Sequence, residues 1–190
     1  MKVSIIIICD KIRQEMLERL LVGIKPQLST FDSEIILIHE SNITLNCPPL
    51  PVKVLYFNVL EKQGIPFNRN RGIEKAKGEI IVFIDDDCWV GEKWLEALVK
   101  PFDDLKIMVT TSGTHIPQSN FLGDCISALG FPGGGSLGFE KVWKVSLEGY
   151  TNHLAAGNCA IRRNLFDIVG WFDETLKSGA EDAELSFRIE

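Results

Sequence analysis

The chain has 190 residues, of which 45% are hydrophobic and 24% charged, a composition typical of one globular domain with a substantial core. Its 20 Lys and Arg residues stand against 26 Asp and Glu residues, giving a net charge of -6, and the basic residues form no dense patch. This balance argues against a nucleic-acid partner. The five cysteines have no Cys-x-x-Cys spacing, so we expect reduced thiols in a cytoplasmic protein.

The first half of the sequence alternates apolar, strand-like runs with segments of helical periodicity. Val3–Cys9 predicts a buried strand, too short to span a membrane and without a following cleavage site. Apolar residues from Ile12 to Leu28 then follow helical spacing, with Asp10 as the expected cap. Further strands are predicted at Glu34–Ile38, Val52–Phe57 and Ile80–Ile84, and helices at Phe67–Ala76 and Lys93–Phe102. This alternation predicts right-handed crossovers and a largely parallel sheet.

Three consecutive aspartates, Asp85, Asp86 and Asp87, directly follow the apolar run Ile80–Ile84. Such a run is typical of a central strand buried on both faces, so the aspartates lie at its carboxyl end, where open α/β sheets bind ligands. Adjacent carboxylates repel one another unless water or a cation offsets their charge, and oxygen ligands suit Mg2+ or Mn2+. A solvated acidic turn before the next helix explains the three residues equally well.

No dinucleotide fingerprint and no P-loop follow the predicted strands, so any nucleotide must be held through acidic groups and a metal. After a strand predicted at Ile107–Ser112 the alternation fades. Gly130–Gly138 is too glycine-rich for an element interior and predicts a loop, either a connector or a lid that contacts an acceptor. Leu154–Ile161 predicts a strand in which Gly157 permits close approach of a ligand or of backbone.

The end of the sequence predicts two helices, a short one capped by Asn164 and a last one at Ala183–Ile189. Glu181 and Asp182 open the last helix, where negative charge suits the helix dipole, after the small residues of a tight turn. Capping explains one of these two acids. The histidines are expected to be surface or hydrogen-bonded residues rather than metal ligands; they are His39, His115 and His153.

Several segments together, by their order and spacing, resemble the family 2 glycosyltransferases, which have the GT-A fold and transfer a sugar from a nucleotide donor. The segments are residues 3–7 (VSIII), 34–38 (EIILI), 69–73 (RNRGI), 77–87 (KGEIIVFIDDD), 156–163 (AGNCAIRR), 169–174 (VGWFDE) and 179–188 (GAEDAELSFR). The resemblance implies an α/β fold of the GT-A type, with a mostly parallel central sheet flanked by helices. We expect one domain over 1–190, with a nucleotide-binding half at 1–112, an acceptor-side half at 113–190 and a truncated C-terminus.

On the donor side, the resemblance makes Asp85, Asp86 and Asp87 the family's Asp-x-Asp motif. It implies that Asp85 and Asp87 bind the metal, Mn2+ or Mg2+, and that Asp85 and Asp86 contact the donor. Glu40 falls where the family usually has an aspartate that contacts the nucleotide base, and Arg69 falls in the donor-side helix.

On the acceptor side, the resemblance implies that Asp182 is the general base and that Gly157, Asn158 and Glu181 lie near the acceptor. The sequence also departs from the family pattern. Ile8-Cys9-Asp10 replaces the usual turn after the first strand, and His39-Glu40 replaces a customary Asp-Asp pair.

The leading hypothesis is an inverting glycosyltransferase that moves a sugar from a nucleotide-diphosphate donor to a hydroxyl of a carbohydrate or lipid-linked acceptor, as in polysaccharide biosynthesis. One alternative is a non-catalytic or truncated domain that binds a nucleotide sugar. A sugar nucleotidyltransferase is the other, and it should carry a basic, glycine-rich phosphate loop near the N-terminus, which Ile8–Arg13 is not. Peripheral association with a membrane stays open.

Overall fold

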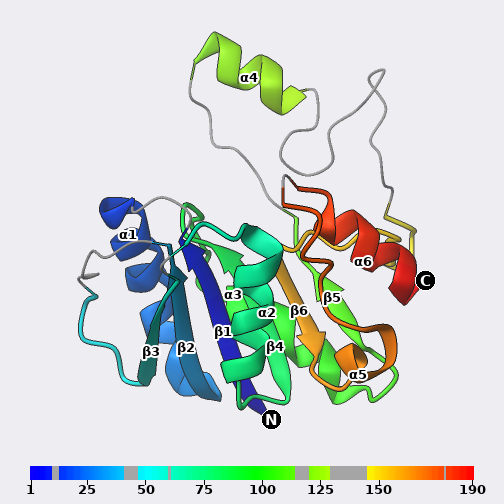
Figure 1. Ribbon diagram of the computed structural model, residues 1–190, viewed down its shortest axis with the longest axis horizontal. Helices are drawn as coiled ribbons and strands as arrows, with labels where there is room; N and C mark the ends of the chain where they lie inside the picture. Colours follow the sequence, from blue (N-terminus) through cyan, green and yellow to red (C-terminus); the bar gives the residue numbers. More distant parts are fainter. Residues whose placement is uncertain (10–12, 41–46, 60, 114–119, 129–144, 178) are drawn as a thin grey trace.

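One six-stranded sheet forms the centre of the protein, with the strand order β3-β2-β1-β4-β6-β5 (Figure 1). The computed structural model describes residues 1–9, 13–40, 47–59, 61–113, 120–128, 145–177 and 179–190. The strands are β1 (Lys2–Cys9), β2 (Asp32–His39), β3 (Lys53–Asn58), β4 (Ile80–Asp85), β5 (Val109–Thr111) and β6 (Asn158–Arg162).

The sheet is parallel on one side and antiparallel on the other. β1 pairs in parallel with both β2 and β4, and β2 pairs in parallel with β3, whereas β6 runs antiparallel to β4 and β5. Cys9 lies opposite His39, and Ile8 lies opposite Asp85. The carboxyl ends of the parallel strands therefore meet at one edge, the upper edge in Figure 1.

Helices cover both faces of the sheet. The helices of the described residues are α1 (Gln14–Ile24), α2 (Ile65–Lys75), α3 (Trp94–Val99), α4 (Phe121–Ala128), α5 (Leu165–Val169) and α6 (Glu181–Ile189), with 3-10 turns at Lys25–Thr30 and Lys100–Asp103, and all but α4 pack against the sheet. In Figure 1, α2 lies across the front of the sheet and α4 lies apart from it.

Alternation along the buried strands divides the core into two layers. Ile5 and Ile7 of β1 join the cluster that includes residues of α1 and α3, whereas Ile6 and Ile8 join the cluster that includes residues of α2, α5 and α6. Successive strand residues point to opposite faces, so a continuous apolar strand supplies both layers. Gly72 lets α2 approach β1, because a Cβ at that position would lie 2.5 Å from Ile6 Cγ2.

Up to β5 the observed elements agree with the predicted ones except at some boundaries, whereas the helix α4 was not predicted. The predicted helix Ile12–Leu28 changes to a 3-10 turn at Lys25, where Pro26 follows, and Asp10 lies outside the described residues. Arg13 holds the N-cap position of α1. The helix predicted at Lys93–Phe102 likewise ends at Val99, before Pro101. A proline ring constrains the preceding residue and removes a backbone donor, which explains both endings.

The second half differs more from expectation. The strand predicted at Leu154–Ile161 begins only at Asn158. Asn164 occupies the N-cap position of α5, but its side chain makes no capping hydrogen bond; its backbone carbonyl instead accepts from the Asp167 N–H. The predicted loop Gly130–Gly138 and His115 lie outside the described residues. Since β6 lies between β4 and β5, both proposed halves of the chain contribute to one sheet.

The structure also bears on the thiols and on membrane spans. All five cysteines are free. Within the described ranges, no helix is both long and apolar enough to cross a membrane.

Candidate active site at the carboxyl edge of the sheet

The three aspartates lie where β4 ends, as the sequence predicted, but in three different environments. Asp85 is the last residue of β4 and its side chain is half exposed. Asp86 is buried, and its charge acts on the Cys9 thiol at the end of β1. Asp87 is exposed to solvent. Of the three, Asp85 and Asp87 are therefore the residues that a ligand at this edge reaches most directly.

Gly157 forms the wall behind the Asp85 carboxylate. Its carbonyl accepts a hydrogen bond from the Asp85 N–H at 3.1 Å, just before β6 pairs with β4. A Cβ at position 157 would collide with the Asp85 carboxylate. The close approach predicted for Gly157 is thus an approach of this backbone to Asp85, and only glycine leaves room for it.

Charge accumulates around Asp85. Enclosure by the surrounding protein raises the pKa of Asp85, and the nearby charges of Asp87, Glu181 and Asp182 raise it further. The Arg69 guanidinium acts in the opposite direction and lies 3.8 Å from an Asp85 oxygen. Residues from β4, the following turn and α6 therefore share one electrostatic environment with an excess of negative charge.

Arg69 and Glu181 form a buried ion pair that joins α2 to the first turn of α6. Their side chains are 5% and 7% exposed, so neither faces open solvent. The guanidinium also lies over the Phe172 ring, 5.5 Å from its centroid. The predicted donor-side and acceptor-side residues thus bind each other, and a role in holding α6 near Asp85 follows directly from their positions.

Asp182 stands next to this pair, half buried at the start of α6. Gly179 and Ala180 precede the helix with φ angles of +117° and 71°, which forms the tight turn predicted from their small size. One Asp182 oxygen accepts a hydrogen bond from the Ala183 N–H at 2.8 Å. His153 lies within electrostatic reach: burial lowers the pKa of His153, and the charge of Asp182 opposes that shift.

The remaining predicted site residues are Asn158 and Glu40, and both make hydrogen bonds within the protein. Asn158 Oδ1 accepts from the Trp94 indole N–H at 2.8 Å, which ties β6 to α3. Glu40 Oε1 accepts from the Gln63 N–H, the Gly64 N–H and the Asn68 amide at 3.0, 3.1 and 2.8 Å. Glu40 therefore fixes the chain as it enters α2. Its contact with a nucleotide base stays a prediction.

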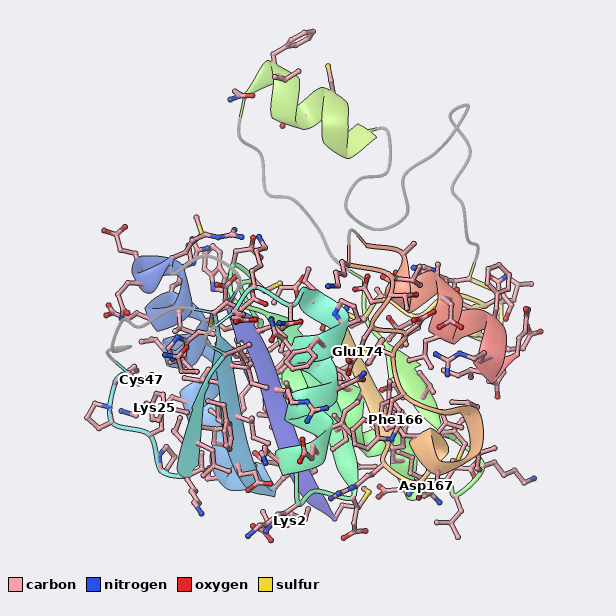
Figure 2. The ribbon with its side chains drawn as sticks, viewed as in Figure 1. Lys2, Lys25, Cys47, Phe166, Asp167 and Glu174 are labelled. Carbon is pink, nitrogen blue, oxygen red and sulfur yellow. The ribbon has the colours of Figure 1, made fainter. Side chains whose placement is uncertain are left out.

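Another polar contact also joins α2 to the segment before α6. Asn70 exchanges hydrogen bonds with the Phe172 backbone and donates to Glu174 Oε1 at 2.9 Å. Figure 2 labels Glu174 beside α2. This contact and the Arg69–Glu181 pair hold α2 and the α6 region together at two places.

Arg13 is a site residue that sequence reasoning did not identify. Its guanidinium forms an ion pair with Asp87, with both side chains 41% exposed. Arg13 follows the Ile8-Cys9-Asp10 segment, which departs from the family pattern, and no motif marks it. The only available signal was its place after a strand that neighbours β4.

The donor set at this edge fits a hard divalent cation. Asp85 and Asp87 supply carboxylate oxygens, and the charges acting on Asp85 are mostly negative, which a cation would offset. In the part of the chain that the structure describes, no three His, Cys, Asp or Glu side chains stand together as a metal site. A cation held by Asp85 and Asp87 would therefore complete its ligands from water or from the donor's phosphates.

Comparison with known proteins identifies the family. The model described as "Glycosyl transferase family 2" matches residues 4–169. The chain belongs to glycosyl transferase family 2. Polypeptide N-acetylgalactosaminyltransferase 11 of Xenopus tropicalis is 28% identical over an alignment of 152 residues, and the match covers 74% of this family 2 chain and 25% of that protein.

Solved structures show the same fold. The mannosyltransferase PcManGT from Pyrobaculum calidifontis, in complex with GDP-Man and Mn2+, has a TM-score of 0.63 and 16% identity, over 96% of the family 2 chain and 50% of its own. TarS of S. aureus in complex with UDP-GlcNAc has a TM-score of 0.60 and 17% identity, over 99% and 53%. The predicted family and the GT-A fold class are both confirmed, although the family 2 chain spans only about a quarter of the relative and half of these neighbours.

Proposed function

We propose that this chain is the nucleotide-sugar domain of an inverting glycosyltransferase that acts on a hydroxyl acceptor. The observation that carries the proposal is that two carboxylates, one at the end of a strand and one at the start of a helix, lie near each other at one edge of the sheet. Asp85 ends the central strand, and Asp182 opens α6 close enough for its charge to act on Asp85. Direct displacement at an anomeric carbon requires such an arrangement, with leaving-group stabilisation on one side and a base on the other.

The donor is a nucleotide-diphosphate sugar held with Mn2+ or Mg2+. The solved neighbours bound to GDP-Man with Mn2+ and to UDP-GlcNAc support this donor class. Asp85 and Asp87 would hold the metal, which, when bound, offsets the charge that builds on the departing diphosphate. Asp86 and Arg69 border the same edge, and Glu40 is proposed to accept a hydrogen bond from the base.

Asp182 removes the proton of the acceptor hydroxyl. Asp182 lies at the start of α6, where negative charge suits the helix dipole, and it accepts a hydrogen bond from the Ala183 N–H. Its half-buried position leaves it accessible to an acceptor. Glu181 is the other carboxylate at the start of α6, but it is buried and pairs with Arg69, which keeps it away from an acceptor. The geometry therefore supports Asp182 as the base and Glu181 as a residue that positions α6.

Binding and transfer measurements on three proteins test the proposal. Calorimetry with nucleoside diphosphates, with and without Mn2+, should show metal-dependent binding by the wild type and by Asp182→Asn, but not by Asp87→Ala. Asn keeps the shape of Asp without its basicity, so single-turnover transfer by Asp182→Asn should fall by ~10^2-fold or more. Active, equally stable Asp182→Asn protein would exclude Asp182 as the base. Wild-type affinity in Asp87→Ala would exclude Asp87 from the metal site.

The same measurements separate the alternative functions. A non-catalytic binding domain would bind the nucleotide but neither transfer nor hydrolyse the donor. A sugar nucleotidyltransferase would release pyrophosphate from a nucleoside triphosphate and a sugar phosphate. The Glu40 contact has its own test, since Glu40→Ala should lower the affinity for the preferred nucleotide; unchanged affinity for every nucleotide would remove that contact.

A further inference from the structure

We propose that the Arg13 guanidinium neutralises Asp87 until a divalent cation binds there, and that it then moves to the diphosphate of the donor. This inference rests on the proposed function and adds an exchange of partners at the same site. It makes Arg13 a residue that lowers the affinity for the free metal and raises the affinity for the donor.

The position of Arg13 is the first argument. Arg13 holds the N-cap position of α1, after β1, and its guanidinium pairs with Asp87 in the turn after β4. β1 and β4 are adjacent and parallel, so both residues lie at the carboxyl edge. Burial and the Asp86 charge raise the pKa of the Cys9 thiol to about 12, and the charge of Arg13 acts against them. The guanidinium therefore acts electrostatically on the end of β1 as well as on Asp87.

The two arginines at this edge are held very differently. Arg69 is 5% exposed and fixed by the buried Glu181, whereas the side chains of Arg13 and Asp87 are each 41% exposed. An exposed ion pair separates at little cost, since water solvates both partners and the long side chain regains rotamers. Arg13 is thus the guanidinium at this edge that is placed to change partners.

Charge determines what Arg13 does once a cation binds. A divalent ion on Asp87 would neutralise the carboxylate and repel the guanidinium, so the ion pair between Arg13 and Asp87 would no longer be favourable. The diphosphate of a donor brings several anionic oxygens to the same edge, and a planar guanidinium binds such oxygens through two parallel hydrogen bonds. The metal therefore competes with Arg13 for Asp87, whereas the diphosphate of the donor attracts Arg13.

This exchange of partners predicts that Arg13→Gln changes the affinity for Mn2+ and the affinity for a nucleoside diphosphate in opposite directions. Mn2+ binding measured by electron paramagnetic resonance without nucleotide should be about two- to fivefold tighter in Arg13→Gln, the range expected when an exposed ion pair no longer competes. Calorimetry at saturating Mn2+ should show nucleoside-diphosphate binding weaker by about tenfold in the same variant. Damage to the fold would weaken both.

Arg71→Gln is the matched control, because Arg71 pairs with Glu74 on α2 at 42% and 41% exposure. It removes the same charge from an equally exposed ion pair and should leave both affinities unchanged. Equal or weaker Mn2+ binding by Arg13→Gln, with normal Mn2+ binding by the wild type, would overturn this inference alone. Failure of the wild type itself to bind Mn2+ would overturn both this inference and the metal part of the proposed function.

Discussion

Contacts at single residues determine the geometry of the site, and the contact between Gly157 and Asp85 is one of them. Gly157 accepts the Asp85 N–H and lies against the Asp85 carboxylate, so the residue before β6 sets where the last side chain of β4 points. The lack of a side chain at position 157 therefore sets the position of the Asp85 carboxylate.

Gly157→Ala should displace the Asp85 carboxylate and weaken Mn2+-dependent nucleotide binding by about 10- to 100-fold, since a shift of about 1 Å in a site residue has effects of that size. Calorimetry in Mn2+ measures the change. Gly91→Ala is the control, because a Cβ at position 91 meets nothing within 4 Å. If Gly157→Ala bound the nucleotide as well as the wild type, Asp85 would not be a donor-site residue.

His153 gives the protein a dependence on pH that a single substitution isolates. Burial lowers the pKa of His153 from its usual value, so the unfolded chain binds a proton more readily than the folded one. Stability is therefore lost as the pH falls from the usual pKa of about 6.5 towards the lower folded-state value.

His153→Asn should reduce this loss, and urea unfolding at pH 7.5 and at pH 5 measures it in both proteins. The loss of unfolding free energy between the two pH values is compared between wild type and variant, because the carboxylates contribute equally to both and cancel. An equal loss of stability in wild type and variant over this range would mean that His153 titrates normally.

At the scale of elements, the link between α2 and the start of α6 holds Asp182 where its charge acts on Asp85. Leu185 of α6 lies in the buried cluster on one face of the sheet. The Arg69–Glu181 pair holds the first turn of α6, and the Asn70 contacts hold the segment before it. A buried pair costs desolvation to form, and it is most damaging when only one partner is removed.

Arg69→Met and Glu181→Leu should each lower the free energy of unfolding by about 3–5 kcal/mol, because each leaves a buried charged group without its partner. The double variant Arg69→Met/Glu181→Leu should lose much less than the sum. Urea unfolding of the four proteins gives the coupling energy. Glu74→Gln, in the exposed pair on the same helix, serves as the control and should cost less than about 1 kcal/mol. Additive losses would show that the buried pair is not coupled.

At the scale of the whole molecule, the sheet joins the two halves of the sequence. β6 comes from the second half, yet it lies between β4 and β5 of the first and pairs with both. Phe166, Phe172 and Leu185 then cover the face of β4 that carries Phe83, whose ring meets Phe172 edge to face at 5.6 Å.

Residues 1–112 alone should not unfold cooperatively, because β4 would become an edge strand and β5 would lose its partner. Each large apolar side chain left uncovered forfeits about 1.5–3 kcal/mol. Urea titration followed by circular dichroism, with the 190-residue chain as the control, checks this expectation. A sharp transition in the fragment would instead show that residues 1–112 fold independently.

Local patterns in the sequence were sufficient for the parallel part of the fold and for the two acidic motifs. The apolar runs of β1, β2 and β4 are continuous because these strands are buried on both faces, and such runs can be recognised in the sequence alone. Asp85–Asp87 were predicted at the carboxyl end of a strand, and Asp182 was predicted at the start of the last helix. Chain order alone, however, did not reveal that β6 enters the sheet antiparallel.

The contacts that determine how the site works were decided only by the tertiary structure. Arg13 and Asp87 are 74 positions apart in the chain, and Arg69 and Glu181 are 112 positions apart. Periodicity reports which face of an element is buried, but it carries no information about which distant side chain will meet it there. The sequence by itself therefore determined which acids stand at the carboxyl edge, and packing between distant elements decided which of them are paired, which are buried and which are exposed.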